Sequence, residues 1–297
     1  MKDKLKIISY VQLMKPAIML LVLVTGSASL VLERSLLIMP WPISIIRFSL
    51  ALLGLMLTGG SANAFNMYLE REIDGQMART RNRRPLPLGK IQPQNALIFA
   101  FVIGLSGVLL FALFFNLLSA ILSMATILFY SLFYTLYLKP RTSYNIVIGG
   151  IAGAMAPVIA WAAASGQITL APLILFAIIF LWTPPHFWAL AIYLKKDYEF
   201  VNYPMMPIAR GIKTTKRQIL SYVVALVVFS GACFYIGSGL FYAIAATILG
   251  LIFVFKTIQF VRSKSIDKAI GLFEFSIVYL LALFAGLIID ATLKMLL

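Results

Sequence analysis

Residues 63–87 read NAFNMYLEREIDGQMARTRNRRPLP and continue an apolar run that begins near residue 46. A run of this length is typical of a helix that crosses a membrane, because about 20 apolar residues span the hydrocarbon core. Asn66, Glu70 and Asp74 are spaced four residues apart, and positions four apart lie on one face of a helix. The sequence therefore predicts a membrane helix that ends in three aligned, oxygen-bearing side chains.

These side chains are of the kind that binds Mg²⁺, which prefers oxygen ligands and commonly shares them with phosphate oxygens. Guanidinium groups bind phosphate through paired N–H donors, and five arginines lie in the same stretch, namely Arg71, Arg79, Arg81, Arg83 and Arg84. The alternative is a solvated helix end whose carboxylates only pair with the arginines. Because ionisable groups in membrane helices are usually functional, we favour a site that binds a diphosphate at the membrane surface.

The composition defines the class of protein. The chain has 297 residues, is 62% hydrophobic and has a mean hydropathy of +0.97, which is typical of a polytopic membrane protein. No long polar block interrupts it, so we expect an all-α fold with one transmembrane domain over residues 1–297. The basic N-terminus precedes an apolar run that we interpret as a retained first helix, not a cleaved signal. The single cysteine, Cys233, excludes an internal disulfide and a cysteine-rich metal site.

Nine apolar stretches predict about nine transmembrane helices. They lie near residues 16–33, 46–69, 93–115, 117–138, 144–164, 171–194, 218–237, 240–261 and 270–291. Of the 25 Lys and Arg residues, all but Arg34, Arg47 and Lys294 fall in the termini and connections on one side. The positive-inside rule then predicts a cytoplasmic N-terminus and a C-terminus on the far side of a prokaryotic cytoplasmic membrane. The rule also accounts for most of the net charge of +15, so binding to nucleic acid is not expected.

A second group of candidates follows the fourth predicted helix, in the stretch 134–145, YTLYLKPRTSYN. Lys139 and Arg141 are either ordinary positive-inside anchors or further contacts to the same diphosphate. Asn145, at the start of the next helix, is polar where lipid contact would not explain it, and Tyr137 offers an aromatic face to a cationic intermediate.

A third group lies at the end of the sixth predicted helix, where residues 181–199 read LWTPPHFWALAIYLKKDYE. We expect Pro184 and Pro185 to break the hydrogen-bond ladder of this helix and to leave room beside a cavity. His186, the only histidine, follows them and is a candidate haem contact; the alternative is that it only donates a hydrogen bond to the backbone of the broken helix. Trp182 offers a second aromatic face. Asp197 is the candidate ligand opposite the first motif, and Lys195 and Lys196 are candidate diphosphate contacts.

These motifs resemble those of the membrane-embedded prenyltransferase superfamily, which includes the ubiquinone- and menaquinone-pathway enzymes. The stretch 66–74 is similar to its first aspartate-rich motif, with Glu70 where an aspartate is usual. Residues 77–87 and the segment Trp182-Thr183-Pro184-Pro185-His186 resemble one branch, the protohaem IX farnesyltransferases. In this chain Val201, and not a second aspartate, stands four residues after Asp197, and members of that branch look similar in this respect.

The resemblance implies nine transmembrane helices around a central cavity that is open to the cytoplasmic side. It implies farnesyl diphosphate and protohaem IX (haem B) as substrates and Mg²⁺ as the cofactor. The implied metal ligands are Asn66, Glu70, Asp74 and Asp197. Candidate partners are the lipid bilayer and haem A synthase or terminal oxidase assembly factors.

Two other functions were weighed against this one. The first is a prenyltransferase of the same fold that acts on an aromatic quinone precursor; His186 and the two prolines argue against it. The second is a transporter, which would require ionisable groups near the bilayer midplane, whereas the carboxylates of this chain gather at one membrane face.

Overall fold

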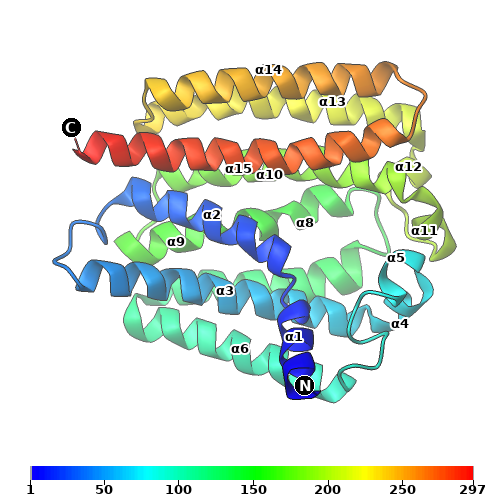
Figure 1. Ribbon diagram of the computed structural model, residues 1–297, viewed down its shortest axis with the longest axis horizontal. Helices are drawn as coiled ribbons and strands as arrows, with labels where there is room; N and C mark the ends of the chain where they lie inside the picture. Colours follow the sequence, from blue (N-terminus) through cyan, green and yellow to red (C-terminus); the bar gives the residue numbers. More distant parts are fainter. Residues whose placement is uncertain (1, 297) are drawn as a thin grey trace.

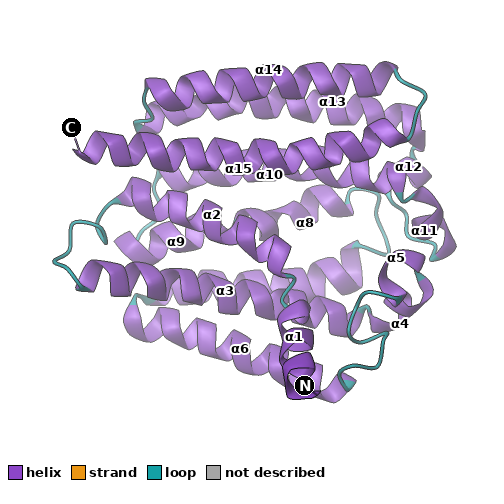
Figure 2. Ribbon diagram, in the orientation of Figure 1, coloured by secondary structure: helices purple, strands orange, loops and turns teal. Residues whose placement is uncertain are grey.

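The computed structural model describes residues 2–296, with side chains from Ile7 onward. The basic N-terminus that helped to predict the orientation includes Lys2, Lys4 and Lys6. The side chains of these three lysines lie outside the described part of the structure. The described residues fold into helices joined by loops, and no strand occurs among them (Figure 2).

Nine helices within residues 2–296 are long and apolar enough to cross a membrane, which confirms the predicted number. In chain order they are α2 (Pro16–Glu33), α3 (Ile43–Leu69), α6 (Pro93–Phe114), α7 with η1 (Leu117–Leu128 and Phe129–Leu138), α8 with α9 (Asn145–Ala154 and Ala156–Ser165), α10 (Leu170–Tyr193), α13 with η2 (Gly211–Ser230 and Gly231–Ile236), α14 (Leu240–Arg262) and α15 (Asp267–Leu296).

Five short helices lie outside these spans: α1 (Lys2–Leu13), α4 (Arg71–Gln76), α5 (Ala78–Arg81), α11 (Lys195–Phe200) and α12 (Met206–Ala209). Figure 1 shows α4, α5, α11 and α12 together at one end of the bundle, whereas the C-terminus lies at the other. An odd number of spans places the start of α2 and the end of α15 at opposite ends. The loops of the first and third candidate groups therefore share one end.

The spans pack in two groups. One buried core joins α10, α13, α14 and α15, and a second joins α2, α3, α6, α7 and α9. Helix α2 contributes Ala28 to the first core and Leu30 to the second, so it links the groups. The outer faces carry exposed apolar residues; on α6 these include Ile98, Val102, Leu105 and Leu109. Their spacing of three and four residues is that of one helix face turned toward lipid.

Several spans depart from regular α-helix. The end of the fourth span, η1, is a π-helix, and the fifth span is divided at Met155, just before Pro157. In contrast, α10 continues through Pro184 and Pro185. The two prolines remove two backbone donors, but the expectation that they open space beside His186 is wrong, because neighbouring helices pack closely there.

Helix α6 approaches α3 closely at Gly107. A Cβ atom at this position would lie 2.7 Å from Cγ2 of Thr58 and 3.1 Å from its backbone nitrogen. Since backbone atoms cannot move aside as a side chain does, any larger residue at Gly107 should push the two helices apart.

We predict that Gly107→Ala lowers the thermal unfolding temperature of the detergent-solubilised protein, because overpacking costs about 1–3 kcal/mol. Gly271→Ala in α15 is the matched control, since a Cβ there has nothing within 4 Å and helix propensity should gain by about 1 kcal/mol. Equal unfolding temperatures for the two variants would contradict close α3–α6 packing.

Candidate active site

Three predicted ligands come together with three cations at the end of α3. Asn66, Glu70 and Asp74 are only 2%, 3% and 2% exposed. The cations that contact them come from three other segments: Lys15 before α2, Arg84 after α5 and Lys139 after η1. We call these six residues the charged cluster. The carboxylates are therefore not solvated, as the alternative had them, although Asp74 does pair with one of the arginines, Arg84.

Asn66 lies on the last turn of α3 and binds two neighbours through its amide. Its Oδ1 accepts a hydrogen bond from Lys15 Nζ at 2.7 Å, and its Nδ2 donates to Thr135 Oγ1 at 3.1 Å. Thr135 belongs to η1 and donates its own proton to the Tyr130 carbonyl. The π-helical turn thus brings a hydroxyl acceptor to the amide.

The two carboxylates share three ion pairs with two cations. Lys139 donates to Glu70 Oε1, and Arg84 donates to Asp74 Oδ2. Arg84 also lies 3.7 Å from Glu70 Oε2. A buried carboxylate without such a partner would be costly, so the cations account for the burial of both acids.

Burial and charge shift the ionisation of this cluster. Burial alone would raise the pKa of Glu70, but the adjacent Lys139 and Arg84 lower it below its usual value. Burial raises the pKa of Asp74 despite Arg84. For Lys15, burial and the nearby charge of Arg84 lower the pKa to about 7, since its hydrogen-bond partner is neutral.

The cluster has more positive than negative charge. Among the described side chains it holds three basic groups and two carboxylates. Arg79, on the adjoining α5, also has a buried Nε without a hydrogen-bond partner in the described part of the chain. A surplus of buried donors suits a polyanionic ligand such as a diphosphate.

The second motif reaches the same end of the bundle. Asp197 on α11 accepts a hydrogen bond from the backbone N–H of Arg79 at 3.2 Å, which ties α11 to α5. Lys195 pairs with Glu199 at 2.9 Å, and Lys196 is exposed. The structure therefore brings Asp197 to the first motif's loop, while neither lysine contacts the charged cluster. That Asp197 shares a metal with Asp74 stays a prediction.

Tyr203, which the sequence analysis did not select, contacts the charged cluster through Lys139. It is 5% exposed, and Lys139 Nζ lies 5.1 Å from its ring centroid, a cation–π distance. Burial and the charge of Glu70 raise its pKa.

The remaining candidates near Lys139 separate into buried and exposed groups. Asn145 is fully buried and donates to the Thr142 carbonyl at 2.6 Å, while its Oδ1 has no partner among the residues described. Arg141 instead lies over the exposed ring of Tyr137, and Arg81 is exposed. The structure therefore leaves Tyr137, Arg141 and Arg81 outside the charged cluster.

His186 and Trp182 bind α15 and not the charged cluster. Trp182 Nε1 donates to the Ser276 carbonyl, and His186 Nδ1 lies 2.7 Å from Ser276 Oγ. The imidazole stacks between the rings of Trp182 and Phe273, with centroids 4.2 and 4.4 Å away. The partner of His186 is thus a side chain of α15 and not the backbone of α10, as the structural alternative had it; a haem contact stays a prediction.

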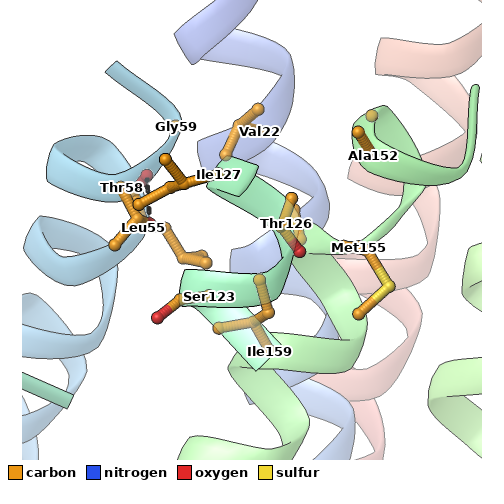
Figure 3. A pocket seen from close by; sticks show the side chains of 12 residues that line it. Val22, Leu55, Thr58, Gly59, Ser123, Thr126, Ile127, Ala152, Met155 and Ile159 are labelled. Atoms are coloured by element: carbon orange, nitrogen blue, oxygen red, sulfur yellow. Dashed lines mark hydrogen bonds between the residues drawn. The ribbon is translucent and has the colours of Figure 1, made fainter. Parts of the chain in front are cut away.

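An apolar cavity of about 50 Å³ lies deeper in the bundle, between α2, α3, α7, α8 and α9 (Figure 3). Leu55 and Gly59 of α3 line it. They precede Asn66 by 11 and 7 residues, which is nearly a whole number of turns, so all three lie on one face of α3. At 1.5 Å per residue the cavity is about 10–16 Å from Asn66 along the helix.

The donor set of the charged cluster fits Mg²⁺ by chemistry, because amide and carboxylate oxygens converge there. Among the described residues no group of three or more His, Cys, Asp or Glu side chains is placed to bind a metal ion. A metal at this site would therefore depend on Asn66 and on oxygens supplied by a ligand. It would also compete with Lys15, Arg84 and Lys139 for these oxygens.

Sequence reasoning missed Lys15, Thr135 and Tyr203 as parts of the site. Lys15 was counted only among the positive-inside charges; its place next to Pro16, at the very start of the first span, was the one available signal. Thr135 and Tyr203 reach the site through a π-helical turn and a long loop, and neither has a spacing pattern.

The chain matches a known family over most of its length. The model of the UbiA prenyltransferase family matches residues 18–285. A protein of Stutzerimonas stutzeri named protoheme IX farnesyltransferase is 44% identical over 95% of this chain and 92% of its own length. A protein of the same name from Bartonella tribocorum is 41% identical over 98% and 93%.

Solved structures show the same fold at low identity. A digeranylgeranylglyceryl phosphate synthase has a TM-score of 0.77 and 19% identity, covering 96% of this chain and 98% of its own. A UbiA homolog from Archaeoglobus fulgidus, bound to GPP and Mg²⁺, has a TM-score of 0.63 and 12% identity, covering 94% and 99%.

We predict that Arg84→Met strongly destabilises the protein, by about 3–5 kcal/mol, because it leaves Asp74 buried without its counter-ion. Adding Asp74→Asn should recover much of this loss, since the buried charge is then removed as well. Thermal unfolding in detergent measures both, with exposed Arg83→Met as the control. Additive losses in the double variant would contradict the ion pair.

Proposed function

The chain belongs to the UbiA prenyltransferase family, and we propose that it transfers a farnesyl group from farnesyl diphosphate to a vinyl group of protohaem IX, giving haem O. The main structural support is the charged cluster, in which three partly buried basic groups outnumber the two buried carboxylates at the end of a membrane helix. The family relatives named protoheme IX farnesyltransferase support the choice of acceptor.

The diphosphate binds at the charged cluster. Arg84 and Lys139 provide positive charge beside its oxygens, and the unpartnered Nε of Arg79 gives a further donor. Asn66, Glu70, Asp74 and Asp197 are the residues that would hold Mg²⁺, which supplies charge neutralisation to the leaving diphosphate. Fixed donors of this kind stabilise developing negative charge best where water is excluded.

The reaction is electrophilic. The bond between C1 of the farnesyl group and the diphosphate oxygen breaks, and its electron pair leaves with the diphosphate. The π electrons of the haem vinyl group form the new carbon–carbon bond to C1. A water molecule adds to the resulting cation beside the macrocycle and loses a proton, which gives the hydroxyethylfarnesyl group. The apolar bundle limits access of other water molecules to the allylic cation.

The farnesyl chain follows the face of α3 that joins Asn66 to the apolar cavity. Thr58, Ser123 and Thr126 line this cavity, but their hydroxyls donate to carbonyls of their own helices. The lining is therefore effectively apolar, as an isoprenoid requires.

We further propose that the nine spans form one domain with a cytoplasmic N-terminus, since nearly all Lys and Arg residues lie at the end with the charged cluster. Both substrates would then enter from the cytoplasmic side and from the bilayer. Haem A synthase and terminal oxidase assembly factors are the candidate protein partners, because they use the product.

Incubation of the purified protein with haem B, farnesyl diphosphate and Mg²⁺ tests this function, with haem O detected by mass. An arm with 4-hydroxybenzoate in place of haem B tests the aromatic acceptor. Prenylation of that acid without haem O formation would replace the proposed function by the quinone-precursor activity.

We predict that Asp74→Ala abolishes haem O formation while leaving folded protein in the membrane. Glu70→Asp should retain more activity than Glu70→Gln, because the Lys139 ammonium needs a negative partner. The difference should be about tenfold or more, the value of a charge-assisted contact. Normal turnover of Asp74→Ala at low Mg²⁺ would contradict the metal assignment.

We predict that Thr126→Phe shifts the preference from farnesyl toward geranyl diphosphate, because the larger ring fills the cavity. The ratio of kcat/KM values should change by roughly tenfold or more. Thr247→Phe on α14 is the matched control, since its hydroxyl also bonds the carbonyl four residues earlier but it lies on an exposed face. An unchanged ratio in Thr126→Phe would place the farnesyl chain elsewhere.

A further inference from the structure

Lys15 occupies an unusual place for a basic residue at a membrane helix end. It lies between α1 and α2, yet its side chain turns into the protein and reaches Asn66, 51 residues away in the chain. An ordinary positive-inside anchor places its ammonium in the headgroup region. Lys15 instead places it inside the charged cluster.

The backbone of Lys15 has a conformation that residues other than glycine rarely adopt. Lys15 has φ 54° and ψ 71°, in the left-handed region, where a residue with a Cβ is strained and persists only if its surroundings fix it. Here Lys15 N–H donates to the Gln12 carbonyl at 3.1 Å, and Ile18 N–H donates to the Lys15 carbonyl at 2.9 Å.

The preceding residue is fixed as well. The Met14 carbonyl accepts a hydrogen bond from Asn63 Nδ2 at 3.2 Å, and the Met14 side chain packs where a Cβ on Gly60 would lie. Helix α3 thus holds both sides of the α1–α2 junction. The strained turn directs the Lys15 ammonium toward the face of α3 that bears Asn66.

The charge of this ammonium lacks a partner of its own. Arg84 pairs with Asp74, and Lys139 pairs with Glu70. Lys15 has only the neutral Asn66 amide as its hydrogen-bond acceptor among the described residues. A buried ammonium that faces a neutral dipole is stabilised less than one that faces an anion, so the structure supplies a cation for which the missing partner is a negative ligand.

We propose that Lys15 binds the diphosphate of the prenyl substrate. Its ammonium moves from Asn66 Oδ1 to a diphosphate oxygen, and this exchange frees the Asn66 oxygen for a cation that accompanies the diphosphate. The inference rests on the proposed function, since it requires a prenyl diphosphate at the charged cluster. It adds a residue that immediately precedes the first span to a site that the sequence analysis placed on the later loops.

Equilibrium binding of a non-reactive farnesyl thiodiphosphate to the purified protein, with Mg²⁺ present, tests this proposal. Lys15→Asn removes the ammonium but tolerates the left-handed backbone, so it should remain folded. We expect its Kd to rise by roughly tenfold to a hundredfold, the range of a lost hydrogen bond to a charged group. Lys15→Arg should stay within a few-fold of the parent.

Lys216→Met is the matched control, because the Lys216 ammonium donates to the Ser263 carbonyl and not to the charged cluster; its Kd should not change. Inorganic pyrophosphate as a second probe should show the same order of affinities, since the contact is to the diphosphate. Parent-like affinity of a folded Lys15→Asn protein would overturn the role of Lys15. Failure of the parent protein to bind either probe would instead overturn the proposed function.

Discussion

The burial of opposite charges at the end of α3 is the constraint on which the rest of this structure depends. Glu70 and Asp74 are almost completely buried, and a buried carboxylate is tolerated only with a counter-ion at close range. Arg84 and Lys139 meet this requirement from loops that follow the second and fourth spans. The second and fourth spans must therefore converge at this end of the bundle, and the first span joins them through the hydrogen bond from Lys15 to Asn66.

This convergence also explains why the loops are ordered near the cluster. Thr80 donates its hydroxyl proton to the Asp74 carbonyl, and Asp197 accepts from the Arg79 N–H. Within the connection between α3 and α6, α5 is consequently tied both to α4 and to α11 of the other half. The diphosphate of the proposed reaction would contact a frame assembled from both halves of the chain, and such positioning contributes to catalysis.

The two halves of the bundle have different chemistry. The first half combines the charged cluster with an apolar cavity of about 50 Å³ on one face of α3, so charged and apolar surfaces follow one another along the same helix. The second half places Trp182, His186 and Phe273 in a stacked group bonded to Ser276. That group fastens α10 to α15 at the point where Pro184 and Pro185 remove backbone donors.

The sequence by itself determined the nine spans, their alternation and the first motif. These features follow from local rules: the length of apolar runs, the charge of the connections and the four-residue spacing of Asn66, Glu70 and Asp74. The tertiary structure alone decided which cations serve those residues. Arg84 and Lys139 were candidates on the same footing as Arg81 and Arg141, which remain outside the cluster. Lys15 was counted only among the positive-inside charges. Which basic residues enter the cluster and which stay outside depends on a left-handed turn at Lys15, a π-helical end of the fourth span and the packing of distant helices. None of these has a periodic signal, because each is set by contacts between residues far apart in the chain.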